Sequence, residues 1–221
     1  MFAGPLTESI VARARRNKLV EIRLIDLREF THDQRRTVDD TPYGGGAGMV
    51  LKPEPLFAAL EELRGPQTRV ILMSPQGEPF GQRTAARLAR EQHLLFICGH
   101  YEGVDERVRQ ALVDEEISIG DFVLTNGNLA AMVVADAVIR LLPGALGCEA
   151  SAGSESFAEE GLLEYPHYTR PEEFRNLAVP AVLSAGHHRR VEAWRREQRL
   201  LRTIARRPDL LMTAVEETRH E

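Results

Sequence analysis

Two apolar runs, separated by an amphipathic segment, constrain the fold of this chain more than any other feature of its sequence. Residues 69–74 and 93–99 are almost continuously apolar, and residues 82–91 between them have the spacing of a helix. Continuous apolar runs are typical of parallel strands covered on both faces, whereas strands with one wet face alternate. The sequence therefore predicts an α/β domain with a parallel sheet.

Similar segments flank this pair. Residues 19–27 are predicted as a strand because apolar and polar side chains alternate there. The helix at residues 53–63 begins with proline, whose missing N–H costs nothing in the first turn. The other predicted helices span residues 7–17, 104–113 and 130–141, and a further strand spans residues 117–121.

Residues 143–176 differ from everything before them, because they are rich in Gly, Ser, Glu and Pro and show no periodicity. The segment is longer than ordinary connections. Beyond it we expect a short apolar piece at 181–184, a long helix at 187–207 and a last helix at 208–217. The predicted organisation is a domain at 1–147, a flexible linker at 148–176 and a small all-helical domain at 177–221.

The long predicted helix is strongly basic, although the net charge of the whole chain is negative. The formal net charge is −5, yet residues 187–207 hold eight arginines and two glutamates, so this segment carries +6 and the remainder −11. We predict that the arginines contact nucleic-acid phosphates, with a solvated helix face as the alternative. Helical spacing gives a predicted buried stripe of Val191, Trp194, Leu201 and Ala205, and a basic stripe of Arg195, Arg199, Arg202 and Arg206.

Targeting and cysteine signals point to one compartment. Charges interrupt every apolar stretch before it reaches the roughly 20 residues that a membrane helix needs, so no membrane partner is expected. The start of the chain has no apolar secretory core. Cys98 and Cys148 lack metal-ligand or redox spacing. These features predict a soluble cytoplasmic protein with unpaired thiols and no metal site.

The densest motif is the glycine cluster at residues 43–49, Tyr-Gly-Gly-Gly-Ala-Gly-Met. It does not fit the dinucleotide fingerprint, because Met49 stands at the place of the last glycine, nor the P-loop, because no Gly-Lys-Ser/Thr follows. The cluster is either a flexible turn or a backbone that approaches a ligand or base closely. On the second interpretation, Gly45 and Gly46 are candidate substrate contacts.

Two further loops follow predicted strands, at the edge where ligands sit in open α/β sheets. Residues 98–107 are a candidate pocket wall, with helix capping by Asp105 and surface ion pairs as the alternative. His100 is a candidate general base or, alternatively, a hydrogen-bonded structural residue. Residues 117–128 form a loop whose backbone suits recognition of an adenine between apolar side chains, with an ordinary turn as the alternative.

One string, Gly-Leu-Leu-Glu-Tyr-Pro-His-Tyr-Thr-Arg-Pro at residues 161–171, is highly specific. Taken with the others in order, it resembles the bacterial tRNA (guanine-N1)-methyltransferase family, the TrmD type of the SPOUT superfamily. The resemblance covers nearly the whole chain. The other strings that carry it lie at residues 30–33, 37–40, 42–49, 74–77, 98–108, 118–124 and 143–147.

This resemblance implies a domain tied in a deep trefoil knot, followed by a linker and a helical domain. It implies an obligate homodimer with active sites at the interface. The implied reaction moves a methyl group from S-adenosylmethionine to N1 of the guanine directly 3′ of the tRNA anticodon, and a divalent ion such as Mg²⁺ is left open. The residues implied to hold the donor are Ser74, Pro75, Gly99, Glu102, Ile119, Gly120, Asp121, Phe122, Val123, Leu124 and Gly127.

By the same resemblance, Arg140 and Glu155 form the catalytic pair. N1 of a neutral guanine carries a proton and becomes nucleophilic only as that proton leaves, with negative charge growing on O6. An acid must take the proton and a cation must stabilise the oxygen. From the residues alone, Arg140 is equally an ordinary cation at a helix end, and Glu155 a solvated acid.

Four features depart from the pattern of the family. Glu155 stands where aspartate is usual, and the extra acid in Glu159-Glu160 leaves the base assignment open among them. Asn126-Gly127-Asn128 replaces Gly-Gly-Glu and Ala130 replaces proline; asparagine tolerates a positive φ, so we expect the bend to survive. The opening strand and a Leu-Phe-Pro segment are missing, which indicates a mis-set start or a trimmed sheet edge.

An active methyltransferase is therefore the function that we expect. One alternative is a non-catalytic RNA-binding relative that has lost donor binding or proton abstraction, and another is a related methyltransferase with a different RNA target. The departures at residues 126–130 and at Glu155 are the features that separate the first alternative from the enzyme.

Overall fold

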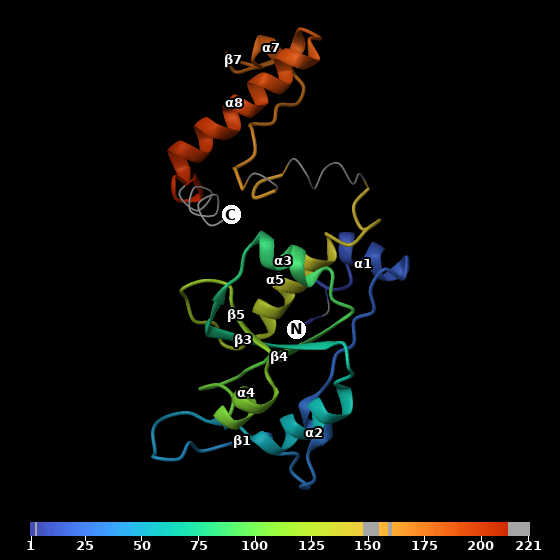
Figure 1. The fold of residues 1–221 in the computed structure, drawn as a ribbon, viewed down its shortest axis with the longest axis vertical. Coiled ribbons are helices and arrows are strands. Elements are labelled where there is room, and N and C mark those ends of the chain that lie inside the picture. The colour runs from blue at the N-terminus through green and yellow to red at the C-terminus, as the bar shows by residue number, and fades with distance from the viewer. Residues whose placement is uncertain (3, 148–154, 159–160, 212–221) are drawn as a thin grey trace. The chain divides into compact units, whose positions relative to one another are not determined.

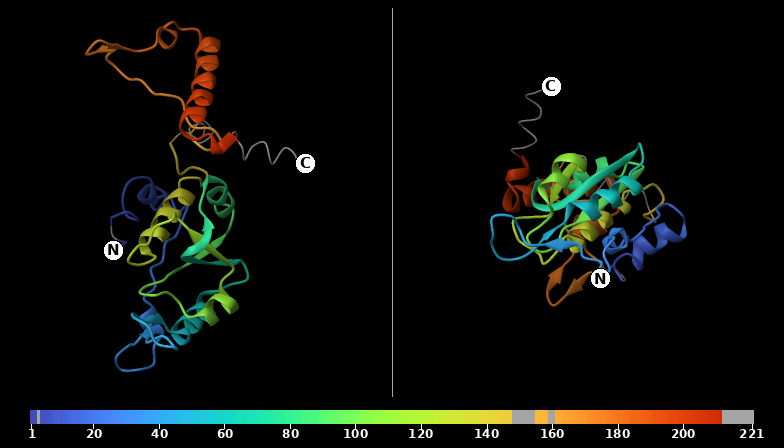
Figure 2. Two further views of the ribbon diagram at one scale, coloured as in Figure 1. Left: turned by 90° about the vertical axis from the view of Figure 1, so that its left-hand side faces the viewer. Right: turned by 90° about the horizontal axis from the view of Figure 1, so that it is seen from below.

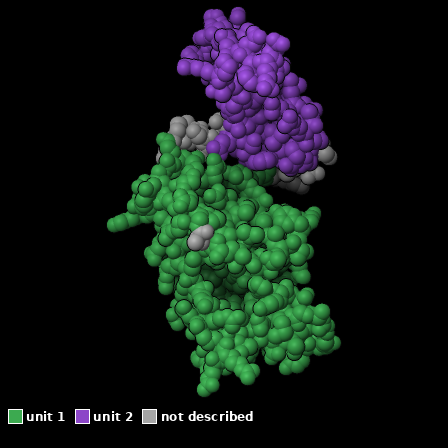
Figure 3. Space-filling view, turned by 180° about the vertical axis from the view of Figure 1, so that it is seen from behind, with its two compact units in different colours: residues 1–147 green, residues 148–221 purple. Residues whose placement is uncertain are grey.

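A computed structural model of the chain describes residues 1–2, 4–147, 155–158 and 161–211. The chain divides into two compact units, Met1–Gly147 and Cys148–Glu221 (Figure 3). Among the described residues, no helix is both long enough and apolar enough to cross a membrane.

The first unit is built around a sheet of β3 (Thr68–Pro79), β4 (His93–Cys98) and β5 (Glu115–Ser118) (Figure 1). The strand order is β4-β3-β5, and β3 pairs in parallel with both neighbours. The predicted parallel α/β sheet is thus confirmed. The two apolar runs of the sequence are the central strand and one of its neighbours, as expected for strands buried on both faces.

One face of the sheet is covered by α3 (Gln82–Leu88) and α5 (Asn128–Ile139), drawn above it in Figure 1. Side chains alternate along a strand, so Ile71 and Met73 of β3 both point to this side. They pack there with fully buried Val134 of α5 in one apolar cluster. The predicted helix at 130–141 is confirmed, with both ends two residues earlier than predicted; at its start, Asn126 Oδ1 accepts the backbone N–H of residue 128.

The opposite face is covered by α2 (Pro53–Leu63) and α4 (Glu106–Leu112). Val70 and Leu72 of β3 point to this side and pack with Leu60, which is 2% exposed. The α2 helix begins and ends where the sequence predicts. The first half of β3 is therefore covered by apolar side chains on both faces.

A third layer is formed by α1 (Ser9–Arg16), whose buried Val11 and Ala14 pack against Met132 and Ile139 of α5. Figure 2 shows α1 in dark blue beside α5 in yellow. The helix predicted at the start of the chain is confirmed.

The strand predicted at residues 19–27 is wrong. Residues 20–26 belong to no ladder, and a 3-10 turn, η1 (Leu27–Phe30), follows them. Alternation of apolar residues is necessary for a half-buried strand but not sufficient, because the backbone also needs a neighbouring strand to satisfy its N–H and C=O groups. Leu24 and Ile25 remain 59% and 41% exposed.

A short hairpin was not predicted. It pairs β1 (Asp39–Asp40) with β2 (Val50–Leu51) in antiparallel fashion and holds the glycine cluster at its tip. Strands of two residues are too short to show a period in the sequence.

The second unit contains α7 (Ala181–Ser184), α8 (His188–Arg206) and a hairpin of β6 (Glu173–Phe174) with β7 (Leu177–Ala178). The hairpin corrects the prediction of an irregular segment up to residue 176 followed by an all-helical domain. Its turn residues, 175 and 176, have φ of 51° and 63°, the conformation that closes a two-residue hairpin. The last predicted helix, at 208–217, lies mostly outside the described residues, and so do residues 148–154 and 159–160 of the predicted linker.

The stripe of α8 predicted to be buried is also wrong in part. Leu201 and Ala205 are exposed, and the fully buried position is Thr203. The Thr203 hydroxyl donates to Arg199 O at 2.8 Å and accepts the N–H of Leu163 at 2.9 Å. The packed face of α8 therefore faces the segment at 161–171. A backbone N–H of this segment needs a hydrogen-bond acceptor, and Thr203 supplies one.

Candidate functional site

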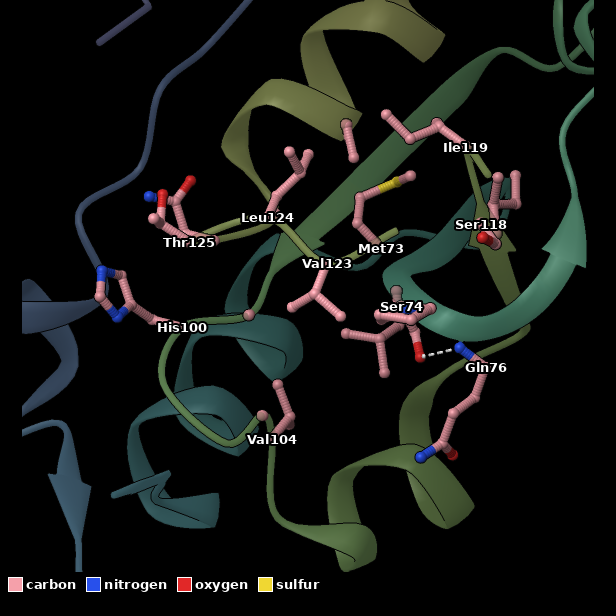
Figure 4. Close-up of a pocket in the computed structure, with 18 of the residues that line it drawn as sticks. Met73, Ser74, Gln76, His100, Val104, Ser118, Ile119, Val123, Leu124 and Thr125 are labelled. Atoms are coloured by element: carbon pink, nitrogen blue, oxygen red, sulfur yellow. Dashed lines mark hydrogen bonds between the residues drawn. The ribbon is translucent and has the colours of Figure 1, made fainter. Parts of the chain in front are cut away.

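A cavity of about 330 Å³ lies at the carboxyl ends of the parallel strands (Figure 4). Its wall comes mainly from three segments, one within β3, one after β4 and one at the end of β5. Its size is at the lower end for sites of small organic ligands. In an open α/β sheet this edge is where ligands bind, because the loops there converge from neighbouring strands. The segments are residues 72–76, 99–104 and 117–127.

The first wall is a bulge in β3. The pairing of β3 with β5 shifts register between Met73 and Glu78, which pushes residues 74–77 out of the ladder. The Ser74 hydroxyl accepts the backbone N–H of Gln76 at 3.1 Å and stabilises the bulge. Gly77 is required because a Cβ there would lie 2.7 Å from Glu116 O, closer than real Cβ atoms approach.

The second and third walls cross each other. Gly127 N donates to Gly99 O at 2.8 Å, and His100 and Asn126 form an antiparallel bridge. A Cβ on Gly127 would lie 2.9 Å from Cys98 Cα. The loop before α5 thus passes directly over the end of β4, and glycine makes this approach sterically possible.

The bend at residues 126–128 survives without the backbone conformation that we expected. Neither Asn126 nor Asn128 has a positive φ, and Asn126 Oδ1 instead accepts the backbone N–H of Asn128 at 3.0 Å, just before the Gly127 N-cap of α5. Asparagine commonly accepts the backbone N–H two residues further along, and this local turn forms here although the family's glycine is replaced.

One end of the cavity is apolar. Met73, Ile119 and Leu124 point toward it in Figure 4, and each packs against or within the core cluster of α3 and α5. The opposite end is polar, with Ser74, Gln76, Glu102 and Arg109 among its lining residues. The cavity is therefore suited to an elongated ligand with a flat apolar group at one end and charged or hydrogen-bonding groups at the other.

Ten of the eleven residues implied to hold the donor line this cavity, and Asp121 does not. Asp121 is exposed, on the loop between residues that do face the cavity. Val104 lies within the pocket wall predicted at residues 98–107, whereas Arg109 was missed, because nothing in its local sequence indicates which loop it approaches. Gln76 was within a quoted string but was not singled out.

His100 takes the structural role that was the alternative in the sequence. Its Nδ1 accepts the backbone N–H of Tyr101 at 2.9 Å, and the two rings pack with centroids 4.2 Å apart. Likewise Asp105 caps α4 by accepting Arg107 N at 2.9 Å, and the Arg107 side chain holds the pKa of that carboxyl below its ordinary value. The loop at residues 98–107 therefore both caps α4 and lines the cavity.

Burial raises the pKa of the Cys98 thiol to about 11, so the thiol stays protonated near neutral pH. A protonated thiol is a poor nucleophile and a poor metal ligand. Among the described residues, no cluster of three or more His, Cys, Asp or Glu could hold a metal ion.

The glycine cluster is attached to the cavity at one end only. Gly45 and Gly46 have φ of 79° and 122°, and a Cβ on either would meet nothing within 4 Å. Their role in this structure is conformational, whereas Gly48 lies against Glu102, where a Cβ would be 2.8 Å from the carboxyl carbon. The N–H of Glu102 donates to Met49 O at 3.0 Å, so the cluster is tied to the cavity wall.

Arg140 and Glu155 belong to different units. Arg140 is the half-buried C-cap of α5, and its N–H donates to Asp136 O at 3.1 Å. Glu155 begins a turn in the second unit, in which Ser156 Oγ accepts the N–H of Glu164 at 3.0 Å. The competing acids, Glu159 and Glu160, lie outside the described residues.

The basic stripe of α8 is not uniformly exposed. Arg199 and Arg202 are half-buried, since they share the packed side of the helix with Thr203. Arg195 and Arg206 are exposed, and the Arg195 guanidinium lies over the Tyr165 ring at 4.7 Å.

Known proteins of one family match nearly the whole chain. The family model described as tRNA (Guanine-1)-methyltransferase TrmD matches residues 1–213. The chain is 60% identical over 212 residues to a tRNA (guanine-N(1)-)-methyltransferase of Brevibacillus brevis, covering 96% of the chain and 87% of the relative. It is 55% identical over 214 residues to the protein of that name from Bacillus subtilis, covering 96% and 88%.

The chain belongs to this family. The resemblance inferred from the sequence strings is thereby confirmed.

Proposed function

We propose that this chain transfers a methyl group from S-adenosylmethionine to N1 of the guanine directly 3′ of the tRNA anticodon. Family membership supports the reaction class. The single structural observation that carries the proposal is the cavity formed by the three crossing segments, because its apolar and polar ends correspond to the two ends of the donor.

The described residues fit the donor. Leu124 and Ile119 provide apolar contact for an adenine, and the backbone of residues 119–127 supplies N–H and C=O groups for its edge. Ser74, Gln76 and Glu102 provide polar groups for the sugar and the amino-acid part. When bound, S-adenosylmethionine supplies an electrophilic methyl group on a positively charged sulfur.

The catalytic roles fall to Arg140 and Glu155. Guanine N1 attacks the methyl carbon as its own proton departs, and negative charge grows on O6 meanwhile. Glu155 accepts the proton, and the guanidinium of Arg140 stabilises the oxygen. Glu155 is one methylene longer than the usual aspartate, so the turn that carries it must sit about one bond length further from the guanine.

The proposal includes a trefoil knot and an obligate homodimer. The knot is supported by the passage of residues 119–127 over the end of β4, through the Gly127 to Gly99 hydrogen bond. The homodimer is supported by apolar side chains that the single chain leaves uncovered next to the cavity, since such patches mark interaction sites. These are Phe122, Val123, Leu129 and Val133, which are 54%, 84%, 45% and 49% exposed.

The test is a methyl-transfer assay on tRNA transcripts that differ only at the nucleotide after the anticodon, with and without Mg²⁺. We expect transfer to the transcript with guanine at that position and none to the transcript with adenine. Calorimetry provides an independent measurement: the parent should bind about one donor per subunit, and Leu124→Arg should bind none, because a charge would fill the apolar end. A chain that binds tRNA but no donor would instead be the non-catalytic relative.

A further inference from the structure

Arg109 lines the polar end of the cavity, although it lies on α4 and not on any of the three crossing segments. Its Nη1 donates to Gln76 Oε1 at 3.1 Å and to Glu106 Oε2 at 3.0 Å. Its Nε and Nη2 both donate to Glu116 Oε1, at 3.0 and 2.6 Å. One guanidinium thus joins a helix, a strand and the bulge of β3.

Glu116 supports the bulge at two points. Its backbone packs under Gly77, where a Cβ would not fit, and its carboxylate is linked to Gln76 through Arg109. The pair is well shielded, because the side chains of Arg109 and Glu116 are only 27% and 22% exposed. Within the described part of the chain, buried Glu116 Oε2 accepts no hydrogen bond, so the carboxylate is committed to Arg109 through its other oxygen.

The contact with Arg109 also determines which way the Gln76 amide faces. Arginine has only donors, so the group that it contacts on Gln76 is the carbonyl oxygen, and the amide nitrogen keeps its two hydrogens for another partner. Arg109 is itself balanced by Glu116 and Glu106, and therefore is not a free cation for a ligand carboxylate.

We infer that Arg109 is a positioning residue for the methyl donor: together with Glu116 it fixes the bulge at residues 74–77 and turns the Gln76 amide N–H groups toward an oxygen of the donor's polar half. This inference rests on the proposed function, because it needs a donor in the cavity. On this inference the ion pair of Arg109 and Glu116, which lies outside the three crossing segments, contributes to donor affinity.

The test is calorimetry of S-adenosylmethionine with the full-length chain. Arg109→Ala should weaken donor affinity about tenfold, the effect of losing one well-oriented hydrogen bond. Arg107→Ala is the matched control, because Arg107 lies on the same helix in an ion pair with Asp105 and does not line the cavity. Its affinity should stay within about twofold of the parent.

A double-mutant cycle separates positioning from general support of the fold. If Arg109 acts through Gln76, adding Arg109→Ala to Gln76→Ala should change affinity by less than about twofold, because the shared interaction is already gone. Gln76→Glu keeps an oxygen in contact with Arg109, removes the N–H groups and adds a negative charge, which also repels an oxygen of the donor. It should weaken binding at least as much as Gln76→Ala.

The outcomes are distinguishable. Additive losses in the cycle, or parental affinity in Arg109→Ala or Gln76→Glu, overturn the inference while the donor site stands. Failure of the parent itself to bind the donor overturns the proposed function instead. Gln76→Glu gives a result even if Arg109→Ala does not fold, because it keeps the ion pair and the size of the side chain.

Discussion

At the scale of single residues, the site depends on a glycine, Gly127, which has no side chain. Gly127 has φ of −75°, which any residue can adopt, so its backbone conformation does not require glycine. What requires glycine is the approach to Cys98 Cα and Gly99 N, where a Cβ would lie at 2.9 and 3.1 Å. The missing side chain therefore allows the two loops to meet, and the Gly127 N–H, which donates to Gly99 O, joins them at the cavity.

Gly127→Ala is expected to separate these loops. The added methyl group should cost about 1–3 kcal/mol of unfolding free energy and weaken donor affinity at least about tenfold, because backbone and not a flexible side chain must move. Thermal unfolding and calorimetry measure the two effects. Gly81→Ala is the control, since Gly81 precedes α3 with extended backbone and nothing within 4 Å of a Cβ. Donor affinity equal to the parent in Gly127→Ala would show that the contact is not needed.

The catalytic pair gives a second prediction at this scale. Arg140→Ala should leave donor binding nearly intact and reduce methyl transfer by on the order of 10² or more, because it removes a charge partner used mainly in the transition state. Glu155→Gln keeps the shape and removes the basicity, and should be similarly slow, whereas Glu155→Asp should retain activity. Single-turnover transfer to tRNA measures the chemical step. A parental rate in Glu155→Gln, with an inactive Glu159→Gln or Glu160→Gln, would move the base assignment to that acid.

At the scale of elements, α8 serves two purposes on its two sides. Its packed side holds the turn of Glu155 indirectly, because Thr203 accepts the N–H of Leu163, and Glu164 next to it bonds Ser156. Its other surface carries exposed arginines. The helix that we expect to contact tRNA and the turn that carries the proposed base therefore belong to one packed element.

The arginines of α8 should differ in their effect on tRNA binding. Arg195→Ala and Arg206→Ala, at exposed positions, should each weaken affinity and reduce the slope of log K against log salt by up to roughly one unit, because each removes a phosphate contact. Half-buried Arg202 should affect stability more than the salt slope. Filter binding over a range of salt concentrations measures the slope. An unchanged slope when both exposed arginines are replaced would remove α8 from the binding surface.

At the scale of the whole molecule, the proposed reaction needs groups from two units. Arg140 lies in the first and Glu155 in the second, so the active site is complete only when both units, from one subunit or from two, face the same guanine. In the proposed homodimer the site lies at the interface between subunits. A mixing experiment shows whether the pair is shared.

Inactive Arg140→Ala and Glu155→Gln chains should restore activity when mixed after unfolding and refolding together. If each site takes one residue from each subunit, half of the dimers carry one intact site of two, so activity should return to on the order of a quarter of the parent. Size-exclusion chromatography with light scattering confirms the dimer. Mixed chains that remain inactive while forming dimers would show that both residues come from the same subunit.

The sequence by itself determined the parallel α/β domain, most of its helices and the family, because apolar periodicity and specific strings are local properties of the chain. Tertiary structure decided the rest. The strand expected at residues 19–27 has no ladder partner. The buried side of α8 is set by a hydrogen bond between Thr203 and the backbone N–H of Leu163, which is distant in the sequence. The bracing of Gln76 by Arg109 joins residues 33 positions apart. Such contacts depend on which segments meet after folding, and no local pattern records them.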